Sequence, residues 1–299
     1  MTKAVTEVGV IGVGIMGSAI ARNLLATDMA VIGFDIAADR QAALKAMGGK
    51  AASSAGEVAG AAEIVLTSLP SSGALEETVA AILARRPRRD LVVAELSTLP
   101  IETKLKCRDA LAAADIAMLD CPLSGTGAQA LNRDLVVYAS GDRGAFERSA
   151  PIFGRFARSS HYLGAFGNGS RMKFVANLLV AIHNVASAEA MVLGIKAGLD
   201  AQDIVKVIAD GAGTSRVFEL RAPMMARADY QPPSMKVSIW QKDMAVIGDF
   251  ARSLGVATPL FAASAPIYDA AIGLGLDGDD TAAVCAVLER MAGIERRSR

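Results

Sequence analysis

A glycine-rich turn near the start of the chain, Gly12-Val13-Gly14-Ile15-Met16-Gly17, constrains the fold more than any other sequence feature. The apolar run Glu7 to Ile11 before it predicts a buried strand, and Ser18 to Leu25 after it predicts a helix with an apolar stripe. In such a strand-turn-helix the glycines permit the tight turn, the approach of backbone to a pyrophosphate, and close packing of helix on strand. The pyrophosphate lies on free N–H groups at the positive end of the helix dipole. We therefore predict that a dinucleotide cofactor binds Gly12, Gly14, Ile15, Met16 and Gly17.

A carboxylate follows the next predicted strand. The apolar run Ala30 to Phe34 ends at Asp35, 18 residues after Gly17. At that place a carboxylate can bind the adenosine ribose hydroxyls and repel a 2′-phosphate, which favours NAD over NADP. NADP remains the less favoured alternative, because the guanidinium of the nearby Arg40 can bind a 2′-phosphate. Asp35 on its own is equally typical of a turn at the end of a strand.

Composition argues against several classes of partner. The 31 basic and 31 acidic residues cancel, so we expect neither nucleic acid nor a membrane surface as a partner. The chain has two histidines and three scattered cysteines, Cys107, Cys121 and Cys285, without metal-ligand spacing. We therefore predict no metal site and a reducing, cytoplasmic setting without a targeting segment.

Strand-like and helix-like segments alternate over the first half of the chain. This alternation predicts an α/β domain over residues 1–164, a Rossmann-like, doubly wound, mostly parallel sheet with helices on both faces. For residues 165–299 we predict an all-helical domain. A long interdomain helix over Ser170 to Lys196 joins it to the first domain. That helix is apolar on nearly every side, so we expect neighbouring helices to bury it. Its charged and amide side chains argue against a membrane span.

Small polar or glycine-rich segments follow four of the predicted strands. In chain order they are Gly12 to Gly17, Ser68 to Ser72, Ser97-Thr98, and Cys121 to Gly127. Because ligands bind beyond the carboxyl ends of strands in an open parallel sheet, these segments share one rim. Each segment alone is also typical of an ordinary loop. We predict that the cofactor contacts the second and third segments, and a substrate carboxylate the fourth. The residues concerned are Leu69, Pro70, Ser97 and Thr98 for the cofactor, and Ser124, Gly125 and Thr126 for the substrate.

Lys173 supplies an ionisable group about one turn inside the long helix. A cation there opposes the helix dipole, and burial adds to the preference for the neutral amine that a general base needs. Asn177 lies four residues later on the same face. The alternative is that Lys173 extends to solvent and Asn177 caps a neighbouring backbone group. Together with the cofactor motif, the pair predicts catalysis.

Four motifs match one family in order and spacing. They are Gly9 to Gly17, Asp120-Cys121-Pro122-Leu123-Ser124-Gly125-Thr126, Gly167 to Asn177, and Lys242-Asp243. In these motifs the chain resembles the β-hydroxyacid dehydrogenases, the family of 3-hydroxyisobutyrate dehydrogenase and, more distantly, of 6-phosphogluconate dehydrogenase. The resemblance covers essentially the whole length. Two departures are Thr126, where the family usually has glycine, and Ala176, where it usually has asparagine.

The resemblance implies hydride transfer between NAD(P) and the hydroxyl-bearing carbon of a small hydroxy acid. It implies that Lys173 is the general acid and base, that Asn177 orients the lysine or the substrate, and that Lys242 lies near cofactor and substrate. It also implies a homodimer or homotetramer formed through the helical domain.

Three other functions stay open on the sequence. One is a reductase of imines or other carbonyls on the same scaffold, in which the lysine position generally holds another residue. Another is a non-catalytic protein that senses nicotinamide nucleotides, since fold alone does not fix function. The third is a purely structural helical oligomer, which leaves the glycine turn and Asp35 without a purpose.

Overall fold

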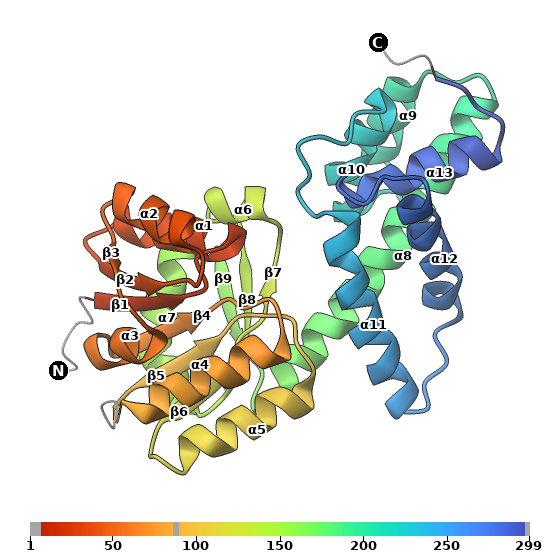
Figure 1. The fold of residues 1–299 in the computed structure, drawn as a ribbon. Helices are drawn as coiled ribbons and strands as arrows, with labels where there is room; N and C mark the ends of the chain where they lie inside the picture. The colour runs from red at the N-terminus through yellow and green to blue at the C-terminus, as the bar shows by residue number, and fades with distance from the viewer. Residues whose placement is uncertain (1–6, 86–89, 297–299) are drawn as a thin grey trace. The chain divides into compact units, whose positions relative to one another are not determined.

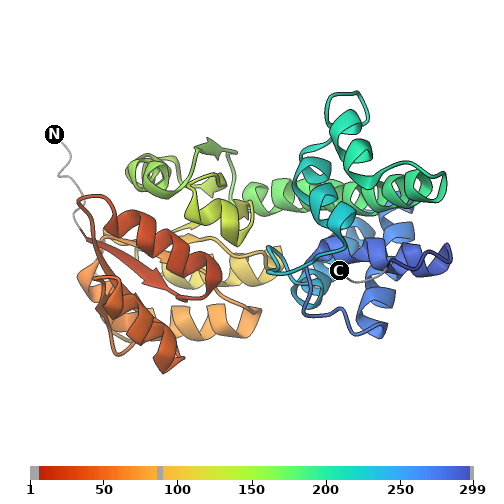
Figure 2. The same ribbon diagram turned by 90° about the horizontal axis from the view of Figure 1, so that it is seen from above.

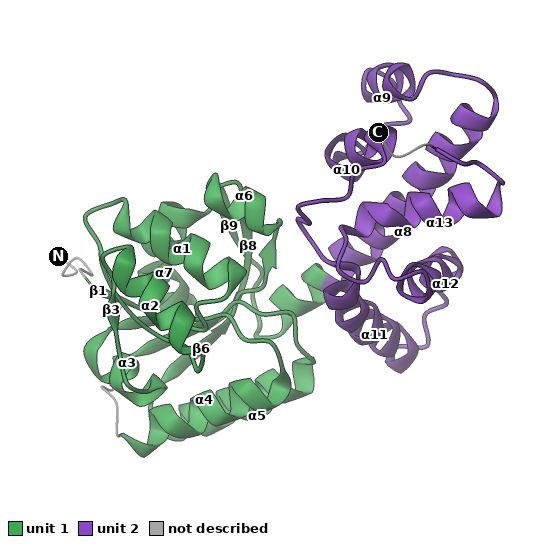
Figure 3. Cartoon of the chain, turned by 45° about the horizontal axis from the view of Figure 1, so that its top comes forward, with its two compact units in different colours: residues 1–173 green, residues 174–299 purple. Residues whose placement is uncertain are grey.

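The computed structural model describes residues 7–85 and 90–296. It divides into two compact units, residues 1–173 and 174–299 (Figure 3). The outer ends of the two predicted domains, residues 1–6 and 297–299, lie outside the described residues.

The first unit is built on one sheet, as the alternating pattern predicts (Figure 1). Its spatial order is β3-β2-β1-β4-β5-β6-β8-β7, with β9 paired to β8. Neighbours from β3 to β6 run parallel, whereas β8 runs antiparallel to β6 and β7. The mostly parallel, doubly wound sheet is therefore confirmed. The described strands are β1 (Glu7–Ile11), β2 (Ala30–Phe34), β3 (Lys50–Ala51), β4 (Ile64–Thr67), β5 (Val92–Glu95), β6 (Ala117–Asp120), β7 (Leu123–Ser124), β8 (Val136–Gly141) and β9 (Ser159–Tyr162).

Helices cover both faces of this sheet and bury a separate core on each. One core holds Ile20 and Phe153, and the other holds Val79 and Leu111. Strand residues alternate between the two cores, since Val10 belongs to the first and Ile11 to the second. The first face carries α1 (Ile15–Leu25), α2 (Ala38–Ala46), α6 (Gly127–Leu131) and α7 (Arg143–Phe156); the second carries α3 (Ala55–Ala61), α4 (Ser72–Ala84) and α5 (Ile101–Ala112).

Chain order reverses between β1 and β4, because the chain moves outward from β1 to β3 and then returns to the other side of β1. This is the switch point at which open α/β sheets leave a crevice beyond their strand ends. The glycine turn follows β1, so the predicted cofactor contacts lie at this position in the sheet.

The long predicted helix exists as α8 (Asn168–Lys196), one continuous helix of 29 residues that contributes to both units (Figure 2). The second unit adds α9 (Ala201–Ala209), α10 (Arg216–Arg227), α11 (Val237–Ser253), α12 (Pro259–Gly273), the short 3-10 helix η1 (Thr281–Ala283) and α13 (Val284–Met291). Val237, Ala271 and Val287 form a core among the last helices. The all-helical second half is thus confirmed.

The expectation that other helices bury α8 on every side is wrong for a single copy of the chain. Only 39% of its most apolar stretch is buried, and Val175, Leu179 and Leu193 are exposed. By length and composition α8 passes the test for a membrane-crossing helix, but core helices of soluble proteins pass it too.

Candidate active site

The turn after β1 has the geometry of a phosphate cradle. Gly12 has a φ of +84°, and a Cβ placed there would lie 2.2 Å from the carbonyl oxygen of Ser68. A Cβ on Gly17 would lie 1.9 Å from the carbonyl oxygen of Gly12, so the helix packs directly on the turn. At Gly14 the same atom would meet only the tip of Arg40, at 3.5 Å. The middle glycine therefore leaves open the side on which a pyrophosphate would approach.

The start of α1 is suited to an anion. Within this fully described helix, no side chain caps the N-terminus and the first turn holds no acidic residue. Ile15 is exposed and Met16 is half-buried beside it. Because unpaired N–H groups and the helix dipole both favour negative charge, the residues present fit a dinucleotide.

Asp35 lies directly after β2 and is engaged through both carboxylate oxygens. Oδ2 accepts a hydrogen bond from the Val13 N–H at 2.8 Å, and Oδ1 accepts one from the Ala37 N–H at 2.9 Å. The half-exposed Arg40 guanidinium lies 3.4 Å from Oδ2. The carboxylate, itself 5% exposed, is thus fixed against the glycine turn.

Two further predicted cofactor segments meet beyond β4 and β5. The Ser97 hydroxyl accepts a hydrogen bond from the Leu69 N–H at 2.8 Å. Pro70 next to Leu69 is exposed, and Thr98 next to Ser97 is half-buried. The structure therefore brings these four residues to one rim.

The predicted substrate loop lies against the cofactor turn. Ser124 pairs with Val136 at the end of β7, and Gly125 has a φ of +133°. A Cβ on Gly127 would lie 2.6 Å from Cγ2 of Ile15, so the start of α6 touches the glycine turn.

Thr126 has a local structural role. Its hydroxyl accepts from the Gln129 N–H while its own N–H donates to Gln129 Oε1 at 3.1 Å, which completes a capping box for α6. The threonine that departs from the family's usual glycine thus starts a helix.

Lys173 lies in the first turns of α8 and is 8% exposed. The helix start just before it is fixed to β6, since Asp120 accepts hydrogen bonds from both the N–H and the hydroxyl of Ser170, each at 2.7 Å. All of these groups belong to the first unit.

Asn177, one turn further along α8, belongs to the second unit. Its amide donates to Asp243 Oδ2 on α11 at 2.9 Å, and both side chains are buried. Lys242 is half-buried and precedes Asp243 on the same helix.

Sequence reasoning missed the roles of four charged side chains, Asp243, Lys104, Glu95 and Asp120. Asp243 belongs to the Lys242-Asp243 motif, but no role is predicted for it. Its partner Asn177 lies 66 residues away in the chain. Lys104, Glu95 and Asp120 are each 0% exposed and form ion pairs. One signal was available, because Glu95 stands inside an otherwise apolar predicted strand, and a carboxylate there requires a buried partner.

Burial accounts for Cys121, which lies next to Asp120 at the substrate motif. The thiol is fully buried and close to the Asp120 carboxylate, and both effects raise its pKa well above the ordinary value. The thiol therefore stays protonated and packs as a small apolar group.

Comparison with known proteins decides the family. The model described as the NAD binding domain of 6-phosphogluconate dehydrogenase matches residues 7–164. The model described as NAD-binding of NADP-dependent 3-hydroxyisobutyrate dehydrogenase matches residues 167–288. The chain belongs to the β-hydroxyacid dehydrogenase family. It is therefore an NAD(P)-dependent oxidoreductase that acts on hydroxy acids.

Relatives match this family member over nearly its whole length. An L-threonate dehydrogenase from Cupriavidus necator is 32% identical, over 94% of this chain and 95% of its own. A 2-(hydroxymethyl)glutarate dehydrogenase from Eubacterium barkeri is 29% identical, over 98% of both. The solved structure of a 3-hydroxyisobutyrate dehydrogenase from Salmonella typhimurium superposes with a TM-score of 0.84 at 29% identity, covering 94% of this chain and 99% of that one.

Proposed function

We propose that this dehydrogenase oxidises a small β-hydroxy acid reversibly with NAD, and that Lys173 is its general acid and base. The observation that carries the proposal is the lysine itself. It is 8% exposed, lies inside the start of a helix anchored by Asp120, and shares a face with Asn177. A solvated structural lysine has no reason to occupy such a place.

The proton chemistry follows from this placement. When bound, the nicotinamide ring supplies the hydride acceptor for oxidation and the donor for reduction. The Lys173 amine takes the hydroxyl proton of the substrate during oxidation and returns it during reduction. Asn177, held by Asp243, orients the substrate oxygen or the lysine.

The substrate class follows from the substrate loop and the relatives. Threonate, 2-(hydroxymethyl)glutarate and 3-hydroxyisobutyrate, after which the relatives are named, all carry a carboxylate and a hydroxyl. The N–H of Thr126 is used in the capping box. The Ser124 hydroxyl and the backbone of Gly125 are therefore the chief groups of the substrate loop left for the carboxylate.

Asp35 supports NAD as the preferred cofactor. Its carboxylate lies directly after β2 against the glycine turn, and a carboxylate at the end of this strand would accept a ribose hydroxyl and repel a 2′-phosphate. Arg40 is the feature that favours NADP. Its guanidinium lies against the Asp35 carboxylate, however, and this carboxylate partly neutralises its positive charge.

The proposal is tested by Lys173→Ala. We expect kcat to fall by ~10² or more, the usual scale for a general acid–base, with NAD affinity in calorimetry unchanged. Lys206→Ala, an exposed lysine on α9, is the matched control and should turn over normally. Activity is measured with NAD and NADP separately, on a panel of L-threonate, 3-hydroxyisobutyrate and 2-(hydroxymethyl)glutarate. Near-normal turnover by Lys173→Ala would remove this lysine from the mechanism.

A further inference from the structure

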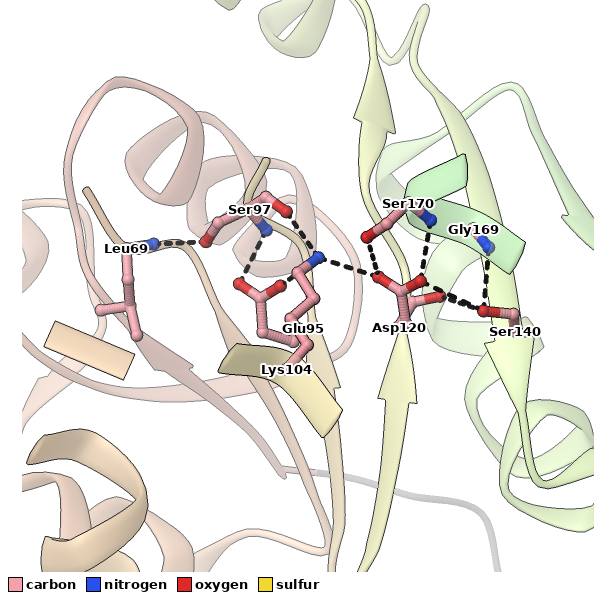
Figure 4. Close-up of polar contacts among 8 residues, drawn as sticks. All are labelled: Leu69, Glu95, Ser97, Lys104, Asp120, Ser140, Gly169 and Ser170. Atoms are coloured by element: carbon pink, nitrogen blue, oxygen red, sulfur yellow. Dashed lines mark hydrogen bonds and ion pairs between the residues drawn. The ribbon is translucent and has the colours of Figure 1, made fainter. Parts of the chain in front are cut away.

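We propose that Lys104, Glu95 and Asp120 form a buried ionic strut that positions Lys173 relative to the cofactor rim. The inference rests on the proposed function, because it explains how the general base is held. The three residues come from α5, β5 and β6, and all belong to the first unit (Figure 4).

The ammonium group of Lys104 lies against three acceptor oxygens. Nζ lies 2.6 Å from Glu95 Oε2 and 2.8 Å from Asp120 Oδ1, and it donates to the Ser97 carbonyl oxygen at 2.7 Å. The Ser97 and Asp120 contacts are hydrogen bonds, whereas the Glu95 contact is an ion pair in which Oε2 accepts no hydrogen bond. Because the side chains of all three strut residues are fully buried, the strut has one geometry and water does not compete for it.

One end of the strut holds the start of the catalytic helix. Besides its two bonds from Ser170, Asp120 accepts a bond from the Ser140 hydroxyl, and that hydroxyl accepts one from the Gly169 N–H at 2.9 Å. Two of the first N–H groups of α8 are thereby satisfied by the strut and its neighbour. A Cβ on Gly169 would lie 2.3 Å from the carbonyl oxygen of Tyr138, so the helix start also packs directly on β8.

The other end reaches the cofactor rim. Glu95 Oε1 accepts a hydrogen bond from the Ser97 N–H at 2.8 Å, and the Ser97 hydroxyl accepts one from the Leu69 N–H. An unbroken series of short polar contacts thus runs from Leu69 to Ser170, as Figure 4 shows. Lys173 follows Ser170 by three residues on the same helix.

Charge explains why the strut stays intact. Two carboxylates against one ammonium leave an excess of one negative charge, and the positive N-terminal end of α8 faces it. Burial alone lowers the pKa of Lys104, but the Asp120 and Glu95 carboxylates outweigh it and raise the pKa above the ordinary value. Lys104 is therefore charged throughout the range in which a dehydrogenase works, and it acts by position without exchanging protons.

The strut is tested at its hydroxyl contacts, because removing a buried charge can prevent folding. Ser140→Ala with Ser170→Ala removes the hydroxyls at the α8 end and keeps the backbone bond from Ser170. Ser149→Ala is the matched control, because Ser149 is equally buried but bonds only within α7, to the Ala145 carbonyl. Activity is followed with the best substrate of the panel above.

We expect the double variant to lose about tenfold or more in kcat, since small misplacements of a catalytic group reach ~10². Its NAD affinity should stay within about twofold of the wild type. Its melting temperature should fall further than that of Ser149→Ala, because the buried Gly169 N–H loses its acceptor. The second variant, Glu95→Gln with Lys104→Met, keeps the net charge of the strut and should show the same loss in kcat.

Two results would overturn the inference. One is a double serine variant that turns over like Ser149→Ala, and the other is a loss of kcat that comes with an equal loss of NAD affinity. Neither result changes what is expected of Lys173→Ala. An experiment that contradicts the role of the strut therefore differs from one that contradicts the proposed function. If a variant does not fold, Ser170→Ala alone gives the same comparison.

Discussion

Asp35 shows how one side chain serves two purposes at the cofactor turn. Its two oxygens accept hydrogen bonds from the N–H groups of Val13 and Ala37, which stabilises the turn, and we propose that its charge sets the preference for NAD. The two purposes can be separated, because asparagine keeps the shape and removes the charge.

Asp35→Asn should therefore shift cofactor preference toward NADP. We expect the ratio of kcat/KM for NAD over NADP to fall about tenfold, equivalent to ~1.4 kcal/mol, because the repulsion of the 2′-phosphate is lost. One backbone bond is lost as well, so the free energy of unfolding should fall by about 1 kcal/mol. Steady-state kinetics and urea unfolding check the two effects. Glu77→Gln, at an exposed carboxylate in the middle of α4, is the control and should change neither.

The glycines of the turn differ in what they make room for, and alanine substitutions should show it. Gly17→Ala places a methyl against backbone, so we expect a loss of about 1–3 kcal/mol in stability. Gly14→Ala has an ordinary φ of −73° and only Arg40 nearby, so stability should change by less than about 0.5 kcal/mol. NAD affinity should nevertheless fall tenfold or more, because the methyl occupies the phosphate side.

The control for this pair is Gly60→Ala in α3. A Cβ there meets nothing within 4 Å, so alanine should stabilise the helix by roughly 0.4–1 kcal/mol and leave NAD affinity unchanged. Thermal unfolding and calorimetry measure both quantities. Equal NAD affinity in Gly14→Ala and wild type would contradict the prediction that the glycine turn binds the pyrophosphate.

At the residue scale, local patterns were predictable and distant partners were not. The glycine turn and Asp35 lie within one strand-turn-helix-strand, so spacing alone predicts their positions. The bond from Asn177 to Asp243 and the pair of Lys104 with Asp120 depend on which elements pack together. A single sequence does not contain that information.

At the scale of elements, long apolar runs were predicted well. The strand over Glu7–Ile11 has the predicted bounds, and α8 begins two residues before its predicted start. The helix α7 was missed, because Pro151 stands inside it and charged residues hide its apolar face of Ile152, Phe153 and Phe156. The two-residue strands β3 and β7 were missed because sheet neighbours define them, and they have no pattern of their own.

At the scale of the whole molecule, the exposed apolar side chains of α8 are the feature that one copy of the chain leaves unexplained. Val175 is 55% exposed and Leu179 is 47% exposed, one turn apart on one face. We propose that a second copy of the chain covers this face, in line with the oligomer that the family resemblance implies.

Light scattering after size-exclusion chromatography tests the oligomer. The wild-type chain should elute as a dimer or tetramer, and Val175→Glu with Leu179→Glu should shift it toward the monomer, since burying two carboxylates in an apolar interface is costly. Ile36→Glu changes an exposed apolar residue of the nucleotide-binding unit and should leave the mass unchanged. A monomeric wild-type chain would contradict the proposal that a second copy covers this face.

The boundary between the two compact units falls between Lys173 and Phe174, inside an unbroken helix. The start of α8 before Lys173 is thus anchored through Ser170 within the first unit, and the amide of Asn177 is anchored through Asp243 within the second. Both residues lie on α8, four residues apart. One residue inserted between them would turn the amide about 100° away from the amine while leaving both anchors in place.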